Sequence, residues 1–587
     1  MHTPPISARS APAIPSDPAA PARRGFMRIG WALGAGSVLS GGLYGCGGDG
    51  ASTFEAHPET FVEPPVLASV NGVLDFTLTL AYTQATLNGK TLTVRTMNGC
   101  VPAPTVRIAA GDILRIKVAN QLPPNPPSVE AARHLRYPNS TNLHTHGLHV
   151  PPGLVAPGVY GDYVLDDASL GIAPGQTRQH EYRIGADHPP GAYWYHPHLH
   201  GSTAMQVGSG MAGALMIRGA IDRVPEIAAA RERIFMFQAP ISDAGGRLES
   251  FTQVAAPDAE PPFLINGVRR PKLVMRRGEV QNWHFINASI STFLNLSLDR
   301  HALHLYSHDG NTRPALLSLP PHPENGLVLA PGNRDSLLVQ AGEAGIYYLR
   351  TLRYDMGNAN PLAEDILAEV TVLDDTGAPA MALPRGPLPV PAALAPIGDL
   401  EFAQGGGLKR SIVMRAVFND NGDPITAAPA SNILHPPAGE LADWTFQTGA
   451  TFLADTVFAM GSAGGPNAPS VPGVPGFPTE FAPFQSASAQ KQVVALGSVE
   501  EWTVYNMNPV QHPFHIHINP FQVIKVNGVA VDPYWADTVG LPRGGSPDNP
   551  TSLTFRTRFT DFKGSYVMHC HILSHEDMGM MQTIEVT

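Results

Sequence analysis

The 23 histidines of this 587-residue chain are its richest supply of side chains that can do chemistry. Ten of them fall in four short clusters, which are His144-Thr145-His146, His196-Pro197-His198, His512-Pro513-Phe514-His515-Ile516-His517, and His569-Cys570-His571 followed by His575 and Met580. Neutral imidazole is the commonest metal ligand among protein side chains. The clusters therefore predict that the chain binds metal ions.

The spacing around Cys570 predicts that one strand serves two metal sites. In a β-strand, residues i and i+2 point to one face and residue i+1 to the other, so His569 and His571 share a face while Cys570 faces away. A thiolate, two imidazoles and a weak axial thioether form the ligand set of an electron-transfer copper. The residues that match this set are Cys570, His512, His575 and Met580.

The other eight histidines form four His-x-His pairs, which supply more imidazoles than one metal ion can use. They predict a cluster of metal ions. Zinc is the main competitor of copper, but a structural zinc site closes with four ligands and usually includes several cysteines. One cysteine beside ten histidines favours copper.

The elements that position these residues are predicted to be strands of three related domains. Three segments have Gly and Asn at the same spacing and tend to alternate polar and apolar residues between them, as a half-buried strand does: Gly111–Asn120, Gly278–Asn287 and Gly497–Asn506. A second set follows in the same order: Gly191–His196, Gly345–Arg350 and Gly564–His569. The repeats predict three antiparallel β-sandwich domains, at residues 65–220, 225–375 and 400–587.

The repeats also predict where the metal cluster lies. His196-Pro197-His198 aligns with His569-Cys570-His571, whereas the second repeat has Arg350-Thr351-Leu352 at these positions. The first and third repeats supply the paired histidines and the second supplies none. We therefore expect the cluster at an interface between the first and third domains, with the second domain as a spacer.

Composition favours an all-β protein. The 58 glycines and 58 prolines suit short strands and turns better than long helices. A net charge of -11 without a basic block argues against nucleic acid as a partner. The Pro- and Ala-rich residues 378–397 are predicted to be a linker. Residues 461–489, rich in Gly, Pro, Ala and Ser, are predicted to be a long surface loop.

Taken together, the four histidine clusters resemble the signature of the three-domain multicopper oxidases, the laccase-like family. The resemblance covers nearly the whole chain after residue 46 and implies three cupredoxin-like Greek-key domains. It also implies four copper ions. Carried over position by position, it gives the type 1 copper to His512, Cys570, His575 and Met580, the type 2 copper to His144 and His515, and the type 3 pair to His146, His196, His198, His517, His569 and His571.

The resemblance implies an oxidase that takes single electrons from a small reducing substrate and uses four of them to reduce dioxygen to water. Electrons are expected to arrive at an exposed edge of His512 or His575 and to travel along the Cys570 strand. Phenols and related aromatics are the expected substrates, with oxidation of Cu(I) or Fe(II) as the alternative. A non-catalytic copper-binding protein and a copper nitrite reductase are further alternatives.

Breaking the O–O bond consumes protons, so carboxylates beside the cluster are expected to donate them. Glu576, which directly follows His575, is one candidate. Asp166 is the other, because it is similar to the family's acidic position between the first two histidine motifs. Asp162 and Asp167 are the alternatives to Asp166.

Residues 1–46 are predicted to be an export signal. Arg23-Arg24-Gly25-Phe26-Met27-Arg28 matches a twin-arginine signal, and the apolar run Ile29–Leu43 is too short to span a bilayer. Leu43-Tyr44-Gly45-Cys46 resembles a lipoprotein box, which predicts lipidation of Cys46 and a membrane tether, with ordinary cleavage nearby as the alternative. Either way, we expect the mature protein to lie outside the cytoplasm, in the periplasm or an equivalent compartment.

Overall fold

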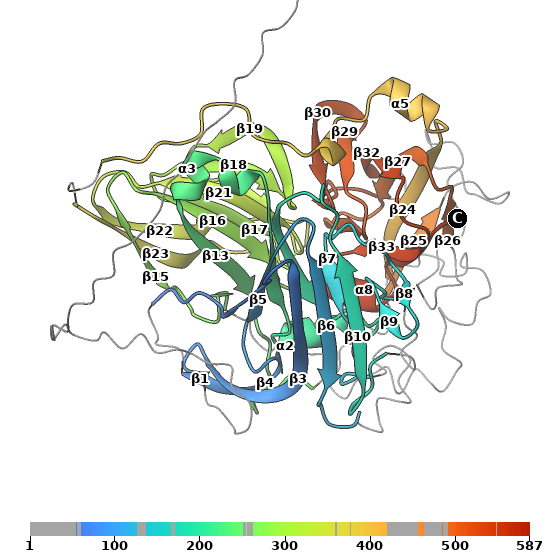
Figure 1. Cartoon of the computed structure of the whole chain (residues 1–587), viewed down its shortest axis with the longest axis horizontal. Helices are drawn as coiled ribbons and strands as arrows, with labels where there is room; N and C mark the ends of the chain where they lie inside the picture. The colour runs from blue at the N-terminus through green and yellow to red at the C-terminus, as the bar shows by residue number, and fades with distance from the viewer. Residues whose placement is uncertain are drawn as a thin grey trace, which may run out of the picture. The chain divides into compact units, whose positions relative to one another are not determined.

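Six β-sheets make up the part of the chain that the structure describes, and they follow one another along the sequence in three pairs (Figure 1). The structure is a computed structural model and describes residues 54–55, 60–125, 137–165, 171–249, 254, 262–358, 361–375, 377, 379–418, 456–462, 484, 491–546 and 549–587. Within these ranges, no helix is long and apolar enough to cross a membrane. The all-β prediction is confirmed.

The first pair of sheets, here called the first domain, contains the strands up to β12. One sheet has the order β1 (Phe54–Glu55), β3 (Val73–Leu87), β6 (Ile113–Asn120), β10 (Thr177–Arg183), β9 (Val159–Tyr160) and β8 (Leu154–Ala156), with β4 (Lys90–Met97) paired to β3. The other has the order β2 (Val66–Ala68), β5 (Ala103–Ala109), β12 (Gly213–Arg218), β11 (Gly191–His196) and β7 (His144–His146).

The second pair of sheets, the second domain, contains β13 to β23. One sheet has the order β14 (Leu264–Ile265), β13 (Arg231–Gln238), β16 (Val280–Asn287), β21 (Arg334–Gln340), β18 (Leu303–His308) and β19 (Asn311–Leu319). The other has the order β15 (Lys272–Arg276), β23 (Asp365–Leu373), β22 (Gly345–Thr351), β17 (Leu294–Leu298) and β20 (Leu327–Leu329).

The third pair, the third domain, repeats the strand order of the second. One sheet has the order β25 (Thr456–Ser462), β24 (Lys409–Phe418), β27 (Ser498–Asn506), β32 (Thr551–Phe559), β29 (Phe521–Val526) and β30 (Val529–Ala536). The other has the order β26 (Lys491–Val494), β34 (Met581–Val586), β33 (Gly564–Cys570), β28 (Pro513–Ile516) and β31 (Thr538–Gly540).

Short helical segments connect some of these strands. The α-helices are α2 (Thr203–Ser209), α3 (Pro225–Ala229), α5 (Asp399–Gln404) and α8 (Leu573–Asp577), and the 3-10 turns are η1 (Ile221–Arg223) and η2 (Ala392–Leu394). Two of them matter for the site, because α2 follows the His196-Pro197-His198 motif and α8 follows the Cys570 strand.

Each domain has its own apolar core. Buried residues alternate with more exposed ones along β6 and along the second half of β27, as expected for strands that turn one face inward. Trp283 lies in the core of the second domain and Trp502 in that of the third, whereas Trp194 packs in a cluster between the first and second domains. The cores of the first and third domains hold the strands that carry the clustered histidines at fixed positions.

The repeated Gly and Asn perform the same task in every domain. The glycine before each strand, at 111, 278 and 497, has a positive φ of 94°, 76° and 86°, which favours glycine. The side-chain amide of the closing asparagine donates to two backbone carbonyls: Asn120 to Asn139 and Ile172, Asn287 to Thr292 and Leu329, and Asn506 to Val510 and Pro542. Asn506 thereby braces the turn that leads to His512.

The described part of the predicted linker, residues 379–397, packs against the second domain. The amide of Met381 donates to the carbonyl of Gly278 at 2.8 Å, and Gln340 donates to the carbonyl of Met381 at 2.6 Å. Leu388 is buried in a cluster with Tyr306 and Leu338 of the second domain. The Pro- and Ala-rich composition did not predict this packing, because only a few larger apolar side chains make the contacts.

Candidate metal centre

The Cys570 set is assembled by three segments of the third domain. His512 directly precedes β28, Cys570 ends β33, and His575 lies on α8. The thiol sulfur of Cys570 lies 3.5 Å from Nδ1 of His512 and 3.7 Å from Nδ1 of His575, and these two nitrogens are 3.3 Å apart. Three soft or borderline donors therefore converge on one point.

Met580 and the backbone complete this region. Met580 is buried in the same core as Cys570, and its carbonyl accepts the Cys570 amide at 3.0 Å. Burial raises the pKa of the Cys570 thiol and lowers the pKa of His512 to about 3. Burial also holds the pKa of His575 well below its usual range, so the imidazoles of His512 and His575 are neutral. The thiol needs a cation nearby to become a thiolate ligand.

The other eight histidines meet in two triads and one pair. In the first triad, Nε2 of His198, His517 and His569 are 3.1, 3.2 and 3.2 Å apart. The centre of such a triangle lies about 1.8 Å from each nitrogen, close to the metal–imidazole distance of about 2.0 Å. The second triad contains His146, His196 and His571, and His144 pairs with His515 beside His146.

Both triads join the first and third domains. His198 belongs to the first domain and lies 371 residues before His569, yet their ring nitrogens are within contact distance. The imidazole of His146 stacks on that of His515 with ring centroids 3.9 Å apart, and His144 stacks on His517 at the same distance. The structure therefore brings together the paired histidines that the repeats predicted to meet.

The donor set fits metal ions. Among the described residues, five buried ring nitrogens facing this cluster have no hydrogen-bond partner: Nε2 of His144, His196, His515 and His571, and Nδ1 of His146. Burying such groups unpaired is costly. Burial together with the neighbouring imidazoles also holds the pKa of His144, His146, His198 and His517 well below the usual range. These lone pairs are available to a cation.

Comparison with known proteins decides the family. Three sequence models described as multicopper oxidase match residues 79–221, 243–377 and 473–587, which together cover most of the chain. The chain belongs to the multicopper oxidase family. It is an oxidoreductase that uses copper, a reducing substrate and dioxygen. The predicted family and the predicted fold of three cupredoxin-like domains are confirmed.

Similar proteins span nearly the whole length of this multicopper oxidase. Laccase-2 of Botryotinia fuckeliana is 24% identical over 557 residues, which are 87% of this chain and 82% of that protein. The multicopper oxidase mco of Staphylococcus haemolyticus is 22% identical over 84% of this chain and 83% of its own. A solved multicopper oxidase from Campylobacter jejuni, described as a metallo-oxidase, has a TM-score of 0.65 and 24% identity and covers 90% of this chain and 95% of its own.

Two buried carboxylates contact the outer nitrogens of the cluster histidines. Asp162 lies 2.9 Å from Nδ1 of His144 and 3.6 Å from Nδ1 of His517. Glu576 lies 3.4 Å from Nδ1 of His198 and 3.2 Å from Nδ1 of His569. Carboxylates in this position fix the tautomer and orientation of metal-bound imidazoles.

Glu576 is held in place by neighbouring groups. It accepts a hydrogen bond from Thr203 of α2 at 3.1 Å, and burial together with the adjacent Asp577 raises its pKa well above the usual range. Asp577 accepts the backbone amides of Gly201, Thr203 and Ala204. The two carboxylates of α8 therefore tie the third domain to the first, directly behind the cluster.

The acidic residues were only partly predictable. Glu576 is placed beside the cluster, whereas Asp166 lies outside the described residues and stays a prediction. Asp162, named above only as an alternative, makes the contacts expected of the acidic position. Sequence reasoning missed Asp537 and Arg334, which lie behind His146 and His515. The sequence marks these positions weakly: Asp537 precedes Thr538, and Arg334 follows a Pro331-Gly332 turn.

Proposed function

We propose that this multicopper oxidase holds four copper ions, with a type 1 ion at His512, Cys570, His575 and Met580. His144 and His515 would hold a type 2 ion, and each of the two triads would hold one type 3 ion. The observation that carries this proposal is the convergence of donor atoms into one His-Cys-His group, two His triads that share no residue, and a further group in which His144 and His515 meet beside His146. When bound, these ions accept electrons singly and store the four that reduce dioxygen to two waters.

The β33 strand connects the two parts of the centre. Cys570 points to the type 1 residues, and His569 before it belongs to the first triad while His571 after it belongs to the second. A reducing equivalent that reaches the Cys570 side therefore has a covalent path of a few bonds to either triad. Substrate and dioxygen need not meet.

His575 is the better candidate for contact with the reducing substrate. His512 is 1% exposed, whereas His575 on α8 is only partly buried. The edge of His575 can thus approach a donor in solution while His512 stays in the core. This favours small donors that reach the protein surface beside α8.

Proton delivery is assigned to Glu576 and Asp162. Glu576 holds its carboxyl between the outer nitrogens of His198 and His569, and Asp162 holds its carboxyl against Nδ1 of His144. These positions place two buried carboxyls at the edge of the cluster, from which each would supply a proton to the dioxygen that is reduced there. Asp166 remains a proposed contributor in the same acidic stretch.

Phenols and related aromatics are the proposed substrates. A similar solved enzyme, from Ochrobactrum, is described as having oxidase activity towards lignin model compounds, with 19% identity and a TM-score of 0.65 over 90% of this chain and all of its own. Oxidation of Cu(I) or Fe(II) is the second candidate. It is favoured by Met578, a partly buried thioether that packs beside α8 near Met205, because thioethers suit Cu(I).

Oxygen uptake tests these proposals. Copper-loaded protein is given a phenol, Cu(I) or Fe(II) in separate assays, and oxygen consumption, peroxide release and bound copper per chain are measured. Four coppers and oxygen uptake without peroxide support the proposal, and the fastest donor identifies the substrate class. Loaded protein that consumes no oxygen with any donor would leave a non-catalytic copper protein, and anaerobic reduction of nitrite would identify a nitrite reductase.

We further propose that the chain is exported by the twin-arginine signal at Arg23 and Arg24 and lipidated at Cys46; residues 1–46 lie outside the described residues. Replacing both arginines with lysine is expected to keep the protein in the cytoplasm. Replacing Cys46 with alanine is expected to release it from the membrane fraction. Unchanged fractionation of either variant would contradict the corresponding step.

A further inference from the structure

One arginine of the second domain bonds to all three domains behind the cluster. Arg334, the first residue of β21, is fully buried. Its Nη1 donates to Asp309 of its own domain at 3.3 Å, and its Nε donates to the carbonyl of Ala192 in the first domain at 3.3 Å. Its two terminal nitrogens bond to Asp537 of the third domain at 2.7 and 2.6 Å. This two-pronged pairing fixes both the position and the tilt of the Asp537 carboxylate.

Asp537 in turn contacts two of the proposed ligands. Its Oδ1 lies 3.3 Å from Nε2 of His146 and 3.6 Å from Nδ1 of His515, and its carbonyl accepts Nδ1 of His515 at 2.8 Å. A carboxylate beside Nε2 of His146 keeps the proton on that nitrogen. Nδ1 of His146 and Nε2 of His515, which have no hydrogen-bond partner among the described residues, would then be the atoms that bind metal.

Backbone segments pack closely around the Arg334–Asp537 ion pair and the cluster histidines. Gly147 follows His146 with a φ of 86°, and a Cβ at this position would clash with the Arg334 guanidinium and lie 2.8 Å from Oδ2 of Asp537. Gly332 packs against the ring of His571, where a Cβ would lie 2.9 Å from Cδ2. Asn333 donates to the carbonyl of Thr538 at 2.8 Å. The segment Gly332–Arg334 is therefore fitted against the cluster.

We propose that Arg334 is a positioning residue of the copper cluster, through which the second domain, which supplies no ligand, sets the geometry of His515 at the type 2 site and of its neighbour His146 at the type 3 site. It acts by holding Asp537, and it touches neither copper nor dioxygen. This inference rests on the ligand assignment proposed above. It gives the second domain a task in the copper chemistry that the histidine pattern does not reveal.

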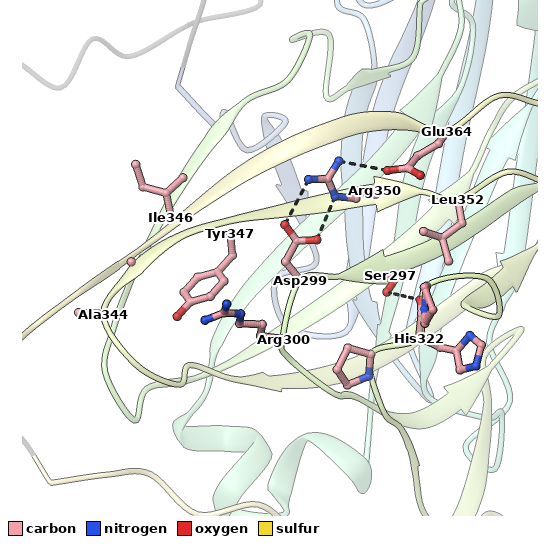
Figure 2. A pocket seen from close by; sticks show the side chains of 13 residues that line it. Ser297, Asp299, Arg300, His322, Ala344, Ile346, Tyr347, Arg350, Leu352 and Glu364 are labelled. Carbon is pink, nitrogen blue, oxygen red and sulfur yellow. Dashed lines mark hydrogen bonds and ion pairs between the residues drawn. The ribbon is translucent and has the colours of Figure 1, made fainter.

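The test compares two arginines of the same domain in copper-loaded protein. Arg334→Lys keeps the positive charge but cannot bond both oxygens of Asp537 at once. Arg350→Lys is the matched control, because Arg350 also bonds two carboxylates, Asp299 at 2.9 Å and Glu364 at 3.2 Å, away from any cluster histidine (Figure 2). The measurements are the type 2 electron paramagnetic resonance signal, the rate of copper loss to a chelator, and the blue type 1 absorption.

We expect Arg334→Lys to shift the type 2 signal and to weaken copper retention there by about tenfold or more, with the blue absorption unchanged. Arg350→Lys should match the wild type in all three measurements. A merely structural role for Arg334 would lower the melting temperature and leave the type 2 signal of folded protein unchanged. That outcome would overturn the inference.

A second variant decides the case if Arg334→Lys does not fold. Asp309→Asn removes one carboxylate partner of Arg334 and weakens the acceptor of the Asp537 and Thr538 amides. It should shift the type 2 signal in the same direction, and an unchanged signal would again refute the inference. A wild-type protein that is blue but has no type 2 signal would instead refute the ligand assignment.

Discussion

The same pair of neighbouring strands carries proposed metal ligands in the first and third domains and the arginine of an ion pair in the second. In the first domain, His196 on β11 lies opposite His144 on β7, and in the third domain, His569 on β33 lies opposite His515 on β28. In the second domain, Arg350 on β22 lies opposite Ser297 on β17. The antiparallel pairing of these two strands is equivalent in the three domains, and the side chains at the paired positions differ.

The second domain keeps at this place a polar cavity of about 780 Å³ whose lining includes Ser297, Asp299 and Arg350. Figure 2 shows the Arg350 guanidinium between Asp299 and Glu364. The cluster of the other two domains is buried because each half covers the other. The comparison teaches that the fold supplies two facing positions on neighbouring strands. Metal binding also needs an imidazole at each position and another domain that covers them with further imidazoles.

The largest effect is expected at the residue that distinguishes the third domain most. Cys570 aligns with Pro197 in the first domain and Thr351 in the second. Replacing Cys570 with serine removes the sulfur ligand and the link to His569 and His571, so the blue absorption and the oxidation of every substrate should be lost. Copper in the cluster should largely remain, as measured by copper content and the type 2 signal. Retained colour and turnover would show that the type 1 assignment is wrong.

The next effect concerns α8, which follows the ligand strand in the third domain. Glu576→Gln keeps the hydrogen bond to Thr203 but removes a proton donor from the type 3 side. Turnover with saturating donor should fall by about 100-fold, within the range for general acid catalysis, while reduction of type 1 copper by substrate in the absence of oxygen keeps its rate. An equal slowing of both steps would place the defect in electron transfer instead.

A moderate effect is expected for the weak ligand. Met580→Leu removes a thioether that donates to type 1 copper, so the type 1 potential should rise while the blue colour persists. A rise of about 60 mV corresponds to a tenfold change in a one-electron equilibrium. The potential is measured by spectroscopic redox titration. An unchanged or lowered value would point to Met578 or Met581 as the axial residue.

A smaller effect is expected on stability in the second domain. His308 is paired with Asp335 at 2.6 Å and lies near Asp309; burial opposes its charge, but the two carboxylates raise its pKa to about 9. Its contribution is therefore complete below the unfolded pKa of about 6.5 and is lost as the pH rises through about 9. His308→Gln should destabilise on the order of 3 kcal/mol at pH 6 and much less at pH 10. An equal melting difference at both pH values would contradict this.

No new copper site is expected from rebuilding the histidine pair in the second domain. Ser297→His combined with Arg350→His restores the pattern of the other domains on β17 and β22, but no partner domain supplies the remaining imidazoles. Copper content per chain should equal that of the wild type. Tightly bound additional copper would show that one pair of strands suffices.

The sequence predicted the ligand positions because their chemistry is local. His-x-His spacing and strand alternation place the side chains correctly, and the Gly and Asn positions of the repeats became turns and amide braces. The supporting residues have no such signal. Arg334, Asp309 and Asp537 are single polar residues in three separate segments, and only tertiary packing makes them neighbours. The prediction of the second domain as a spacer did not include these contacts of Arg334 with the first and third domains.

The predicted loop at 461–489 contains a second kind of feature that the sequence did not predict. Gly461 and Ser462 end strand β25, and Phe484 is buried against Val567 and Met581, with its amide bonded to the carbonyl of Gly579. The rest of this range lies outside the described residues. Composition gave no indication that Phe484 would be buried, because the three phenylalanines of this range stand among glycines and prolines without helical or strand periodicity.

When it holds metal, the cluster would also act as a cross-link between two distant parts of the chain. Four of its imidazoles come from the first domain and four from the third, and the contact between His198 and His569 closes a loop of 371 residues. Every metal ion bound there joins two distant parts of one chain, and closing so long a loop removes much of the freedom of the unlinked state. Pulling on the two ends of the chain should therefore meet a resistance that disappears when a chelator removes the copper.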